Sequence, residues 1–330
     1  MNKKEKRLFL RTFIPSLILF VAIFTLLFTA IRILNLNPGG EDAHILAEEL
    51  ELDYLVDEDS PFFEAFSKDD RVNVLLLGVN GNLTDTIMLV SFNMEHPHVD
   101  IISVPRDTYY KRDGYNSQAE KKLNAAYKGN PVNTAKAVSE ILLGIPINYY
   151  AIVEYDGIKT IVDSMGGVPM DIPFRMKYDD PYDTPPLHID IPEGHHVLNG
   201  EQSVQFLRFR HANKDSGFKS YPEGDMGRVK AQQQFMVNAF KQCLGFDLPK
   251  IATTVYDNLT SDMKLKTMLY FAGKASGITS EDIRTYTLPV DTDPNPPYYV
   301  YPNVGKIEEV LMEIYTIGEA NSENEDTTEE

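Results

Sequence analysis

An uncharged segment near the start of the chain constrains the fold more than any other feature. Residues 13–31 form a run of 19 residues without a charged side chain. As a helix this run would be about 28 Å long, which is close to the thickness of a bilayer's hydrocarbon core. A cleaved signal peptide usually has a shorter apolar region and a small-x-small cleavage site, and the residues before Arg32 offer no convincing site of that kind. We therefore predict an uncleaved transmembrane helix.

Charges are distributed unequally on the two sides of this predicted helix. Five basic side chains and one acid give the stub of residues 1–12 a net charge of +4, whereas Arg32 is the only base between the helix and Lys68. The positive-inside rule predicts a cytoplasmic N-terminus and an extracytoplasmic remainder. We interpret residues 32–70 as an extracytoplasmic acidic linker. Residues 318–330, which are rich in acids and lack aromatic side chains, are expected to be a disordered acidic tail.

The chain beyond the stub is strongly acidic. The whole chain carries −18 at pH 7, so the part after the stub carries −22. A nucleic-acid-binding surface needs clustered Lys and Arg, and we therefore expect no nucleic acid partner. Cys243 is the only cysteine, which excludes an internal disulfide. We expect it to be a buried, small apolar side chain.

Strand-like and helix-like segments alternate over residues 71–317. Residues 73–78 form a continuous apolar run, typical of a strand covered on both faces. Residues 156–165 are expected to form a helix with Asp156 as its N-cap and Gly166 and Gly167 at its end. Other predicted segments are strands at 86–93, 99–104 and 148–154, a helix at 133–143, and further elements at 202–209, 228–244 and 264–276. The pattern predicts an α/β fold, a layered single domain with a mixed central sheet flanked by helices.

Long connections rich in Pro, Asp and Tyr follow Arg175. Connections of this length and composition are often functional, so we expect a surface insertion beside the functional site of the domain.

Polar residues follow the first predicted strand. Gly78 and Asn80 end it, and Asp85 lies in the short polar run that leads into the next strand. Open α/β sheets bind ligands at strand ends, so Asp85 is a candidate ligand for a hard cation, with Asn80 as a weaker, neutral oxygen ligand. The alternative is ordinary turn chemistry of Asn and Asp.

Arginines stand at the ends of two other predicted elements. Pro105 ends a strand and places Arg106 at its tip, where a surface pair with Asp107 is the alternative role. In an extended chain Arg208 and Arg210 would share one face. Two guanidinium groups on one face repel each other unless an anion lies between them, so this pair predicts a phosphate clamp. A solvated charged face is the alternative.

The segment from Asp225 opens a helix. Arg228 and Gln232 are four residues apart and share a face near its start. An arginine there is unfavourable with the helix dipole unless an anion binds at the free amides. Asp225 is either an N-cap or a catalytic carboxylate, and Lys122 is a possible further cation. The core stripe of this helix is expected to be Val229, Met236, Phe240 and Cys243.

Taken together, three arginine sites and an Asp on one α/β scaffold indicate a phosphate site with room for a metal, and the single span suggests a substrate in or on the membrane. A zinc site is not expected from His188, His195 and His196, because adjacent His195 and His196 point to opposite faces of an extended chain.

The order of these motifs resembles the LytR-CpsA-Psr family of cell-wall glycopolymer phosphotransferases. The resemblance covers residues 71–244, with weaker similarity to about residue 317. A short basic stub and one span precede the motifs. The resemblance rests on the apolar run at 73–78, Thr84-Asp85-Thr86, Pro105-Arg106-Asp107, residues 122–127, Gly166-Gly167-Val168, residues 198–201, Arg208-Phe209-Arg210, residues 225–228, and Gln232-Gln233.

The resemblance implies a Mg²⁺-assisted phosphotransferase in the cell membrane of a Gram-positive type envelope. Its substrate would be a phosphate-linked glycopolymer of the teichoic acid or capsule type. The enzyme would move this polymer from a polyprenyl pyrophosphate carrier to a peptidoglycan sugar hydroxyl. The polyprenyl tail would enter an apolar tunnel, whose lining the sequence does not distinguish from core.

The same resemblance implies residue roles. Asp85 would help to bind Mg²⁺, and Asp85 or Asp225 would accept the hydroxyl proton. The pyrophosphate and head group would be bound by Arg106, Arg208, Arg210 and Arg228, with Lys122 and with Gln232 or Gln233.

Three positions depart from the family pattern. The family commonly has Asp where this chain has Asn80, and Arg where it has Leu83 and Ala231. The site is therefore either rearranged or less active. Two alternatives to the transferase stay open. One is a pyrophosphatase acting on the same lipid, with water in place of the sugar. The other is a non-catalytic binding or regulatory scaffold for lipid-linked precursors, which is consistent with the missing charges.

Overall fold

The computed structural model describes residues 62, 65–66, 71–94, 96–183, 186–244, 248–275 and 278–325. All of them belong to one compact unit, residues 41–330. The predicted stub, the predicted transmembrane helix and nearly all of the predicted linker lie outside the described residues. Within the described part, no helix is both long enough and apolar enough to cross a membrane.

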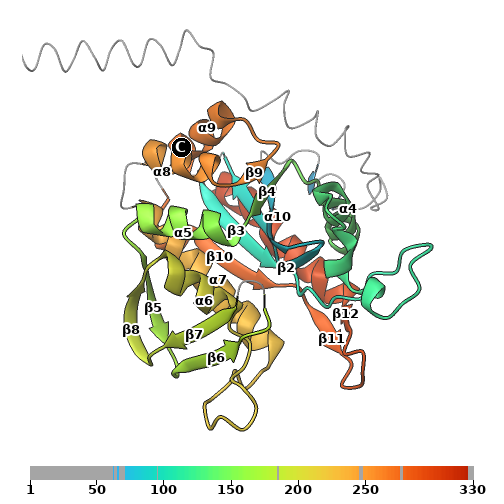
Figure 1. Cartoon of the computed structure of the whole chain (residues 1–330). Helices are drawn as coiled ribbons and strands as arrows, with labels where there is room; N and C mark the ends of the chain where they lie inside the picture. Colours follow the sequence, from blue (N-terminus) through green and yellow to red (C-terminus); the bar gives the residue numbers. More distant parts are fainter. Residues whose placement is uncertain are drawn as a thin grey trace, which may run out of the picture. The chain divides into compact units, whose positions relative to one another are not determined.

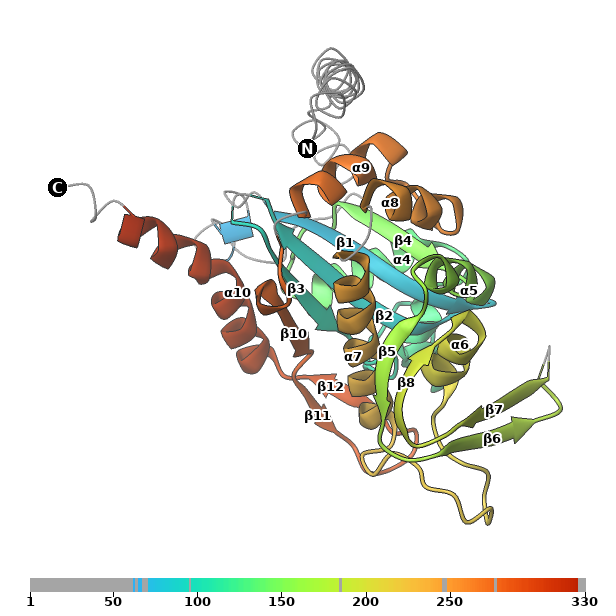
Figure 2. The ribbon, with the colours of Figure 1, turned by 90° about the vertical axis from the view of Figure 1, so that its left-hand side faces the viewer.

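A mixed sheet of six strands forms the centre of the domain (Figures 1 and 2). Its order is β10-β3-β2-β1-β4-β9, and the pairs β1–β4 and β3–β10 are parallel whereas the other neighbours are antiparallel. This confirms the predicted mixed α/β sheet. The strands are β1 (Arg71–Asn80), β2 (Leu83–Asn93), β3 (His98–Ser103), β4 (Tyr149–Val153), β9 (Thr260–Ser261) and β10 (Ile283–Thr287).

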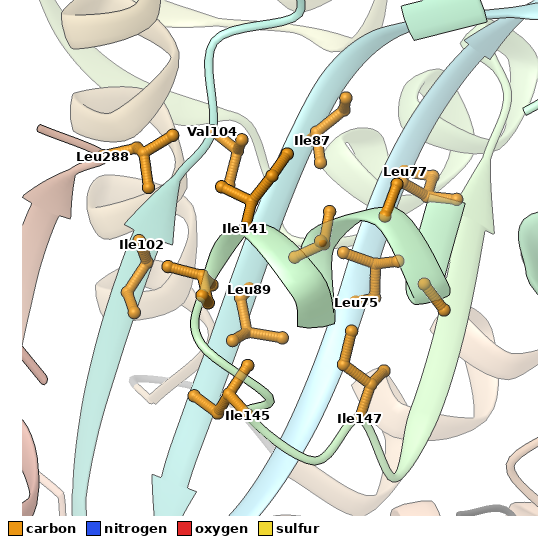
Figure 3. Packing of buried hydrophobic residues seen from close by; sticks show 14 of the residues in the cluster. Leu75, Leu77, Ile87, Leu89, Ile102, Val104, Ile141, Ile145, Ile147 and Leu288 are labelled. Atoms are coloured by element: carbon orange, nitrogen blue, oxygen red, sulfur yellow. The ribbon is translucent and has the colours of Figure 1, made fainter. Parts of the chain in front are cut away.

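Alternate residues of the central strands enter two apolar layers on opposite faces of the sheet. Leu75 and Leu77 of β1 are fully buried against one helical layer (Figure 3), and Leu76 between them packs against the layer on the other face, which is why the middle of this strand is continuously apolar. Met88 of β2 packs into the layer on the other face. The first face is covered by α4 (Pro131–Ile141) and α10 (Val304–Glu325), the second by α7 (Asp225–Leu244) and α9 (Leu265–Lys274).

Two antiparallel ribbons extend the domain beside the sheet (Figure 2). They pack with nearby helices around a second apolar cluster that contains Phe209 and Phe235. The ribbons are β5 (Val168–Ile172) with β8 (Gly194–Leu198), and β6 (Met176–Asp180) with β7 (Leu187–Ile191). The helices are α5 (Tyr155–Ser164), α6 (Gly200–Arg208), α8 (Leu248–Asp257) and α7, which supplies Phe235. The insertion expected after Arg175 is the β6–β7 hairpin.

Several smaller elements complete the domain. They are the 3₁₀ helices η1 (Ala119–Lys121), η2 (Leu123–Ala126) and η4 (Ser280–Asp282), and the ribbon of β11 (Val290–Thr292) with β12 (Val300–Pro302).

Two helix boundaries differ from the sequence prediction. Helix α5 begins at Tyr155, so the predicted N-cap Asp156 lies inside its first turn and Glu154 holds the N-cap position without a side-chain cap bond. Its end is as predicted, because Gly166 and Gly167 adopt φ angles of +74° and +97° that favour glycine. Helix α10 continues through Glu325 and so includes the first residues of the predicted tail. Glu is a good helix former, and the helix propagates from a turn that is packed against the sheet.

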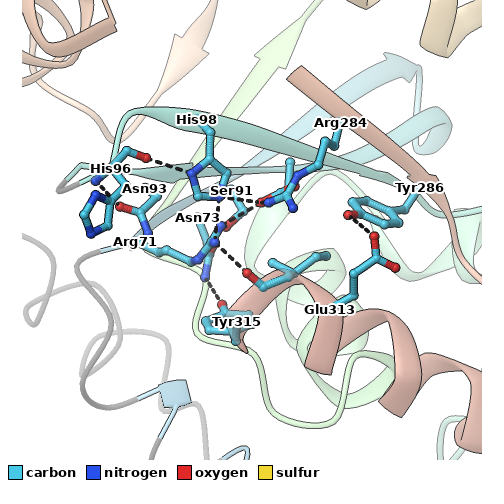
Figure 4. A network of polar contacts seen from close by, with 12 residues as sticks. Arg71, Asn73, Ser91, Asn93, His96, His98, Arg284, Tyr286, Glu313 and Tyr315 are labelled. Atoms are coloured by element: carbon cyan, nitrogen blue, oxygen red, sulfur yellow. Dashed lines mark hydrogen bonds and ion pairs between the residues drawn. The ribbon is translucent and has the colours of Figure 1, made fainter. Parts of the chain in front are cut away.

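A buried charge network joins the first strand to α10 (Figure 4). Asp100 is fully buried and accepts from Arg71 Nη1 at 2.8 Å, while Arg284 Nε lies 2.8 Å from its other oxygen. Arg71 also donates to the carbonyl of Ile314 at 2.6 Å. Burial alone would raise the pKa of Asp100, but the hydrogen bond with His98 and the two guanidinium charges outweigh it and hold the pKa below its ordinary value.

Candidate active site

A polar cavity of about 380 Å³ lies where β1 and β4 end and the β6–β7 hairpin approaches them. This is the strand-end position at which open α/β sheets bind ligands. The charged and polar side chains that line it are Asn80, Asp85, Thr86, Arg106, Tyr155, Tyr178, Asp180, Asp183, Arg208, Arg210, His211, Arg228 and Gln232. The structure thus brings together side chains that are up to 152 residues apart in the sequence, from Asn80 to Gln232.

Arg106 and Asp85 form an ion pair at the edge of the cavity. Strand β3 ends at Ser103 and Pro105 cannot continue it, so Arg106 leaves the sheet as predicted. Asp85 projects from β2, the neighbouring strand. Both side chains are partly buried, at 15% and 31% exposure, which strengthens the pair relative to one in open solvent.

Arg208 and Arg210 line the same cavity, but the backbone conformation at Arg208 differs from the sequence prediction. Arg208 is the last residue of helix α6, and the backbone becomes extended only at Phe209. The extended chain assumed for Arg208 is therefore wrong, although both arginines line the cavity. Phe209 is fully buried and anchors the chain between them.

Arg208 has two further contacts that the sequence analysis missed. It forms an ion pair with Asp183, and its guanidinium carbon lies 4.7 Å from the centre of the Tyr155 ring. Burial, and next the negative charge of Asp85, raise the pKa of Tyr155, so its hydroxyl stays protonated at neutral pH. The only sequence signal for Asp183 was the acid-rich insertion itself.

Helix α7 supplies the innermost part of the site. Arg228 is buried and lines the cavity, and Gln232, one turn later, donates to the carbonyl of Leu207 at 3.1 Å. Gln233 points elsewhere, because its amide donates to the carbonyl of Tyr286 at 2.6 Å and the residue does not line the cavity. Asp225 is the first residue of α7, and its side chain lies outside the described part of the structure.

An apolar cavity of about 420 Å³ adjoins the polar one. Val153 and Ile158 line both, so the two cavities meet at the end of β4 and the first turn of α5. The apolar cavity lies between the sheet and helices α5, α7, α8 and α9.

Three residues of the predicted α7 core stripe line this apolar cavity instead: Met236, Phe240 and Cys243. Cys243 was expected to be buried, but the residue is partly exposed. Its surroundings are nevertheless apolar, and desolvation raises the pKa of its thiol to about 11.

A third hollow, of about 850 Å³, adjoins the polar cavity at Leu83, Arg106 and Arg210. Lys122, a predicted substrate-binding residue, lies here and not in the polar cavity. Its ammonium group is 3.2 Å from the carboxylate of Asp107.

The residues at the predicted metal position fit Mg²⁺ only in part. Asn80 and Asp85 both line the polar cavity, but within the described residues no group of three or more His, Cys, Asp or Glu side chains is arranged to hold a metal. One carboxylate and one amide are too few ligands for a closed site. Mg²⁺ commonly keeps several waters and takes ligands from substrate phosphates, so a site of this kind is adequate once a phosphate is bound.

Two of the other departures from the family pattern have distinct surroundings. Leu83 is 46% exposed and lies at the junction of the polar cavity and the third hollow. Ala231 is partly buried against the second apolar cluster and does not line the polar cavity. Of these two positions, only Leu83 lies where an added cation would face the polar cavity.

Joined cavities of opposite polarity suit an amphiphile with an anionic head. Comparison with known proteins shows the family. Residues 45–314 match the LytR_cpsA_psr family, so the chain belongs to the LytR-CpsA-Psr family. This confirms the resemblance read from the motifs.

Similar proteins include a regulatory protein and a teichoic acid transferase. The chain is 29% identical over 233 residues to "Regulatory protein MsrR" of Staphylococcus aureus (strain COL), covering 67% of this chain and 65% of that protein. It is 28% identical over 255 residues to "Polyisoprenyl-teichoic acid--peptidoglycan teichoic acid transferase TagV" of Bacillus subtilis (strain 168), covering 72% and 62%. The match therefore spans less than two thirds of the length of these relatives.

Solved structures show the same fold. The crystal structure of TagV from B. subtilis superposes with a TM-score of 0.60 at 26% identity, covering 74% of this chain and 96% of that one. A LytR-Csp2A-Psr enzyme from Actinomyces oris gives a TM-score of 0.59 at 25% identity, covering 74% and 89%.

Proposed function

We propose that this protein transfers a phosphate-linked glycopolymer of the teichoic acid or capsule type from a polyprenyl pyrophosphate carrier to a sugar hydroxyl of peptidoglycan. The observation that carries the proposal is the junction at Val153 and Ile158 between the arginine-lined cavity and the apolar cavity. A pyrophosphate with a long apolar chain would place each part in surroundings of matching polarity. The similarity to TagV, which is named a teichoic acid transferase, supports the glycopolymer class.

The arginines would bind the pyrophosphate by exchanging partners. In the structure Arg106 is paired with Asp85 and Arg208 with Asp183. A pyrophosphate carries more charge than a carboxylate and accepts bidentate hydrogen bonds from guanidinium groups, so it would compete well for both. Arg210 and Arg228 line the same cavity and would complete the anion site.

Mg²⁺ would be held by Asp85, with Asn80 as a weaker oxygen ligand. When bound, the metal would polarise the phosphoryl oxygens and neutralise part of their charge. Asp85 becomes available for this role once pyrophosphate has taken over its arginine partner.

The transfer is an in-line displacement at phosphorus. The acceptor hydroxyl oxygen forms a bond to the phosphorus that carries the glycopolymer, and the bond from that phosphorus to the bridging oxygen breaks. Polyprenyl phosphate leaves with the bridging oxygen, and the hydroxyl proton passes to a carboxylate, for which Asp85 and Asp225 are the candidates. The arginines stabilise the charge on the phosphoryl oxygens, which is the main catalytic requirement of phosphoryl transfer.

This reaction requires the domain to stand outside the cytoplasm, on a single span formed by residues 13–31. The basic stub supports that topology. A protease added to wall-stripped cells should digest the chain after Arg32, whereas full protection of the domain would contradict the topology.

Two alternatives use the same site. A pyrophosphatase would use the same arginines with water in place of the sugar. A non-catalytic scaffold is favoured by the loss of a carboxylate at Asn80 and of an arginine at Leu83, and by the name of the MsrR relative.

Turnover of a purified polyprenyl pyrophosphate glycan by the full-length protein in detergent separates these activities. A transferase should release polyprenyl phosphate and label peptidoglycan in equal amounts, and should turn over slowly without acceptor. Release that is independent of acceptor would indicate the pyrophosphatase. Lipid binding without turnover in either condition would indicate the scaffold.

A further inference from the structure

We propose that the third hollow binds the acceptor of the transfer, a glycan strand that carries peptide carboxylates. This inference rests on the proposed function. We call the hollow the basic groove and define it by Leu83, Arg106, Asp107, Lys122, Lys128 and Arg210.

The basic groove, the polar cavity and the apolar cavity are arranged in series. The basic groove shares Leu83, Arg106 and Arg210 with the polar cavity, and it shares no lining residue with the apolar cavity. The polar cavity in turn meets the apolar cavity at Val153 and Ile158. A pyrophosphate in the middle would therefore have its lipid on one side and the basic groove on another.

The in-line geometry of phosphoryl transfer restricts the direction from which the acceptor can approach. The attacking oxygen must approach phosphorus opposite the leaving group, which here is polyprenyl phosphate with its chain in the apolar cavity. The basic groove reaches the phosphate site through Arg106 and Arg210 without passing the lipid. It is therefore the hollow from which a hydroxyl can attack.

The charge of the groove suits an anionic polymer. Among the described residues, its lining has four cationic side chains and the two carboxylates of Asp107 and Glu120. Asp107 is paired with Lys122. Glu120 accepts hydrogen bonds from the hydroxyl and amide of Ser117. The lining therefore has two more cations than carboxylates in a chain of net charge −18. Arg106 and Arg210 are shared with the pyrophosphate site, so within this lining Lys128 is the cation that we assign to a peptide carboxylate.

Lys128 is held at the outer part of this groove by aromatic packing. Its ammonium nitrogen lies 3.7 Å from the centre of the Tyr115 ring, and the guanidinium carbon of Arg112 lies 4.5 Å from the same centre. Lys128 also adopts a φ of +45°, in the left-handed region. The lysine is exposed and positioned, which is what a contact to a peptide carboxylate needs.

A cluster of tyrosines lies beside the groove, next to β11 and β12, although none of its rings lines the groove itself. The rings of Tyr109, Tyr299 and Tyr301 pack with centroids 5.0 to 6.1 Å apart. Tyr109 pairs with Lys122 across a β-bridge, so the cluster is fixed to the groove. Tyr301 is 39% exposed, and the neighbouring Tyr298 is 59% exposed. Rings that are apolar on their faces and polar at their edges suit sugar rings, whose C–H faces are apolar.

Binding of a fluorescent, uncross-linked peptidoglycan fragment to the full-length protein in detergent tests this groove without requiring catalysis. Lys128→Glu and Tyr301→Ala should each weaken fragment binding, by about tenfold for the charge reversal. Lys266→Glu makes the same change at an exposed position of α9. It is the matched control and should bind the fragment like the wild type. Donor lipid affinity should be unchanged in all three variants, which also shows that they are folded.

The outcomes separate the groove from the proposed function. Equal fragment binding by the wild type, Lys128→Glu and Tyr301→Ala would overturn the acceptor site, whether or not the protein transfers glycopolymer. Weakened binding in these two variants, together with a wild type that transfers nothing, would support the groove as a glycan site and reject the transferase.

Discussion

Arg208 and Asp183 form an ion pair that joins the end of helix α6 to the connection after strand β6. Both side chains line the polar cavity. The carboxylate thus lies against a guanidinium group to which we assign the substrate's pyrophosphate, and it acts as a competing internal anion.

Removal of that carboxylate should strengthen anion binding. We expect Asp183→Asn to bind inorganic pyrophosphate about fivefold more tightly than the wild type, because a partly exposed ion pair contributes up to about 1 kcal/mol. Isothermal titration with pyrophosphate measures this directly. Asp190→Asn is the control, because Asp190 pairs with Arg175 outside the cavity. Unchanged or weaker binding by Asp183→Asn would show that this ion pair does not compete with substrate.

The arginines of the cavity should be individually required. Replacing Arg106, Arg210 or Arg228 by Ala should each cost on the order of 2–4 kcal/mol of transition-state stabilisation, measured from kcat/KM. Lys should restore little, because it lacks the bidentate geometry of the guanidinium. Arg175→Ala removes an arginine that is 52% exposed and outside the cavity, and it should retain normal turnover. If all three cavity variants kept near-normal turnover, these arginines would have only structural roles.

The order of the motifs along the chain was enough to predict the mixed α/β domain and much of the polar cavity. Arg106 could be placed because Pro105 ends a strand, and Arg228 because an arginine at a helix start suggests an anion. Gln232 and Gln233 could not be separated, since neighbours on a helix point about 100° apart and only the packing of α7 shows which one faces the cavity.

Other parts of the site depend on tertiary structure. Asp183 and Tyr155 meet Arg208 only because the β6–β7 hairpin and α5 converge on α6. The apolar cavity is lined by Met236 and Phe240 at the same helical spacing as core residues, so periodicity alone cannot distinguish a tunnel from a core.

Metal binding should depend on the substrate. Because Asp85 is paired with Arg106 and Asn80 is neutral, Mg²⁺ should bind the ligand-free protein weakly and should bind much more tightly with pyrophosphate lipid present. Linkage requires that Mg²⁺ tighten the lipid by the same factor. Asn80→Asp should strengthen Mg²⁺ binding in the ligand-free protein, and Asp85→Asn should nearly abolish it, as measured by calorimetry. Unchanged affinity in both variants would mean that these are only turn residues.

Because of Asp100, the free energy of unfolding should fall as the pH is lowered into the acid range. Its pKa is lower in the folded protein than the ordinary value of 3.8, so its contribution is complete above that value and is lost as the pH falls through the folded pKa. Asp100→Asn should lower the free energy of unfolding by about 3–5 kcal/mol at pH 7, because Arg71 and Arg284 lose their buried counter-charge. The loss should be smaller near pH 2.

Urea unfolding at both pH values measures this difference. Asp190→Asn is again the control, since its exposed ion pairs should contribute no more than about 1 kcal/mol. A loss of stability in Asp100→Asn that is the same at pH 7 and pH 2 would contradict the proposed charge network.

The central claim is that one substrate occupies the polar and the apolar cavity together, and mass spectrometry of lipid bound to the purified full-length protein tests it most directly. The wild type should carry a polyprenyl phosphate or polyprenyl pyrophosphate lipid. Ile158→Trp, which narrows the junction, and Arg228→Ala, which removes a buried cation from the polar cavity, should each lose most of that lipid. A wild type without polyprenyl lipid, or full retention of the lipid in both variants, would contradict the account.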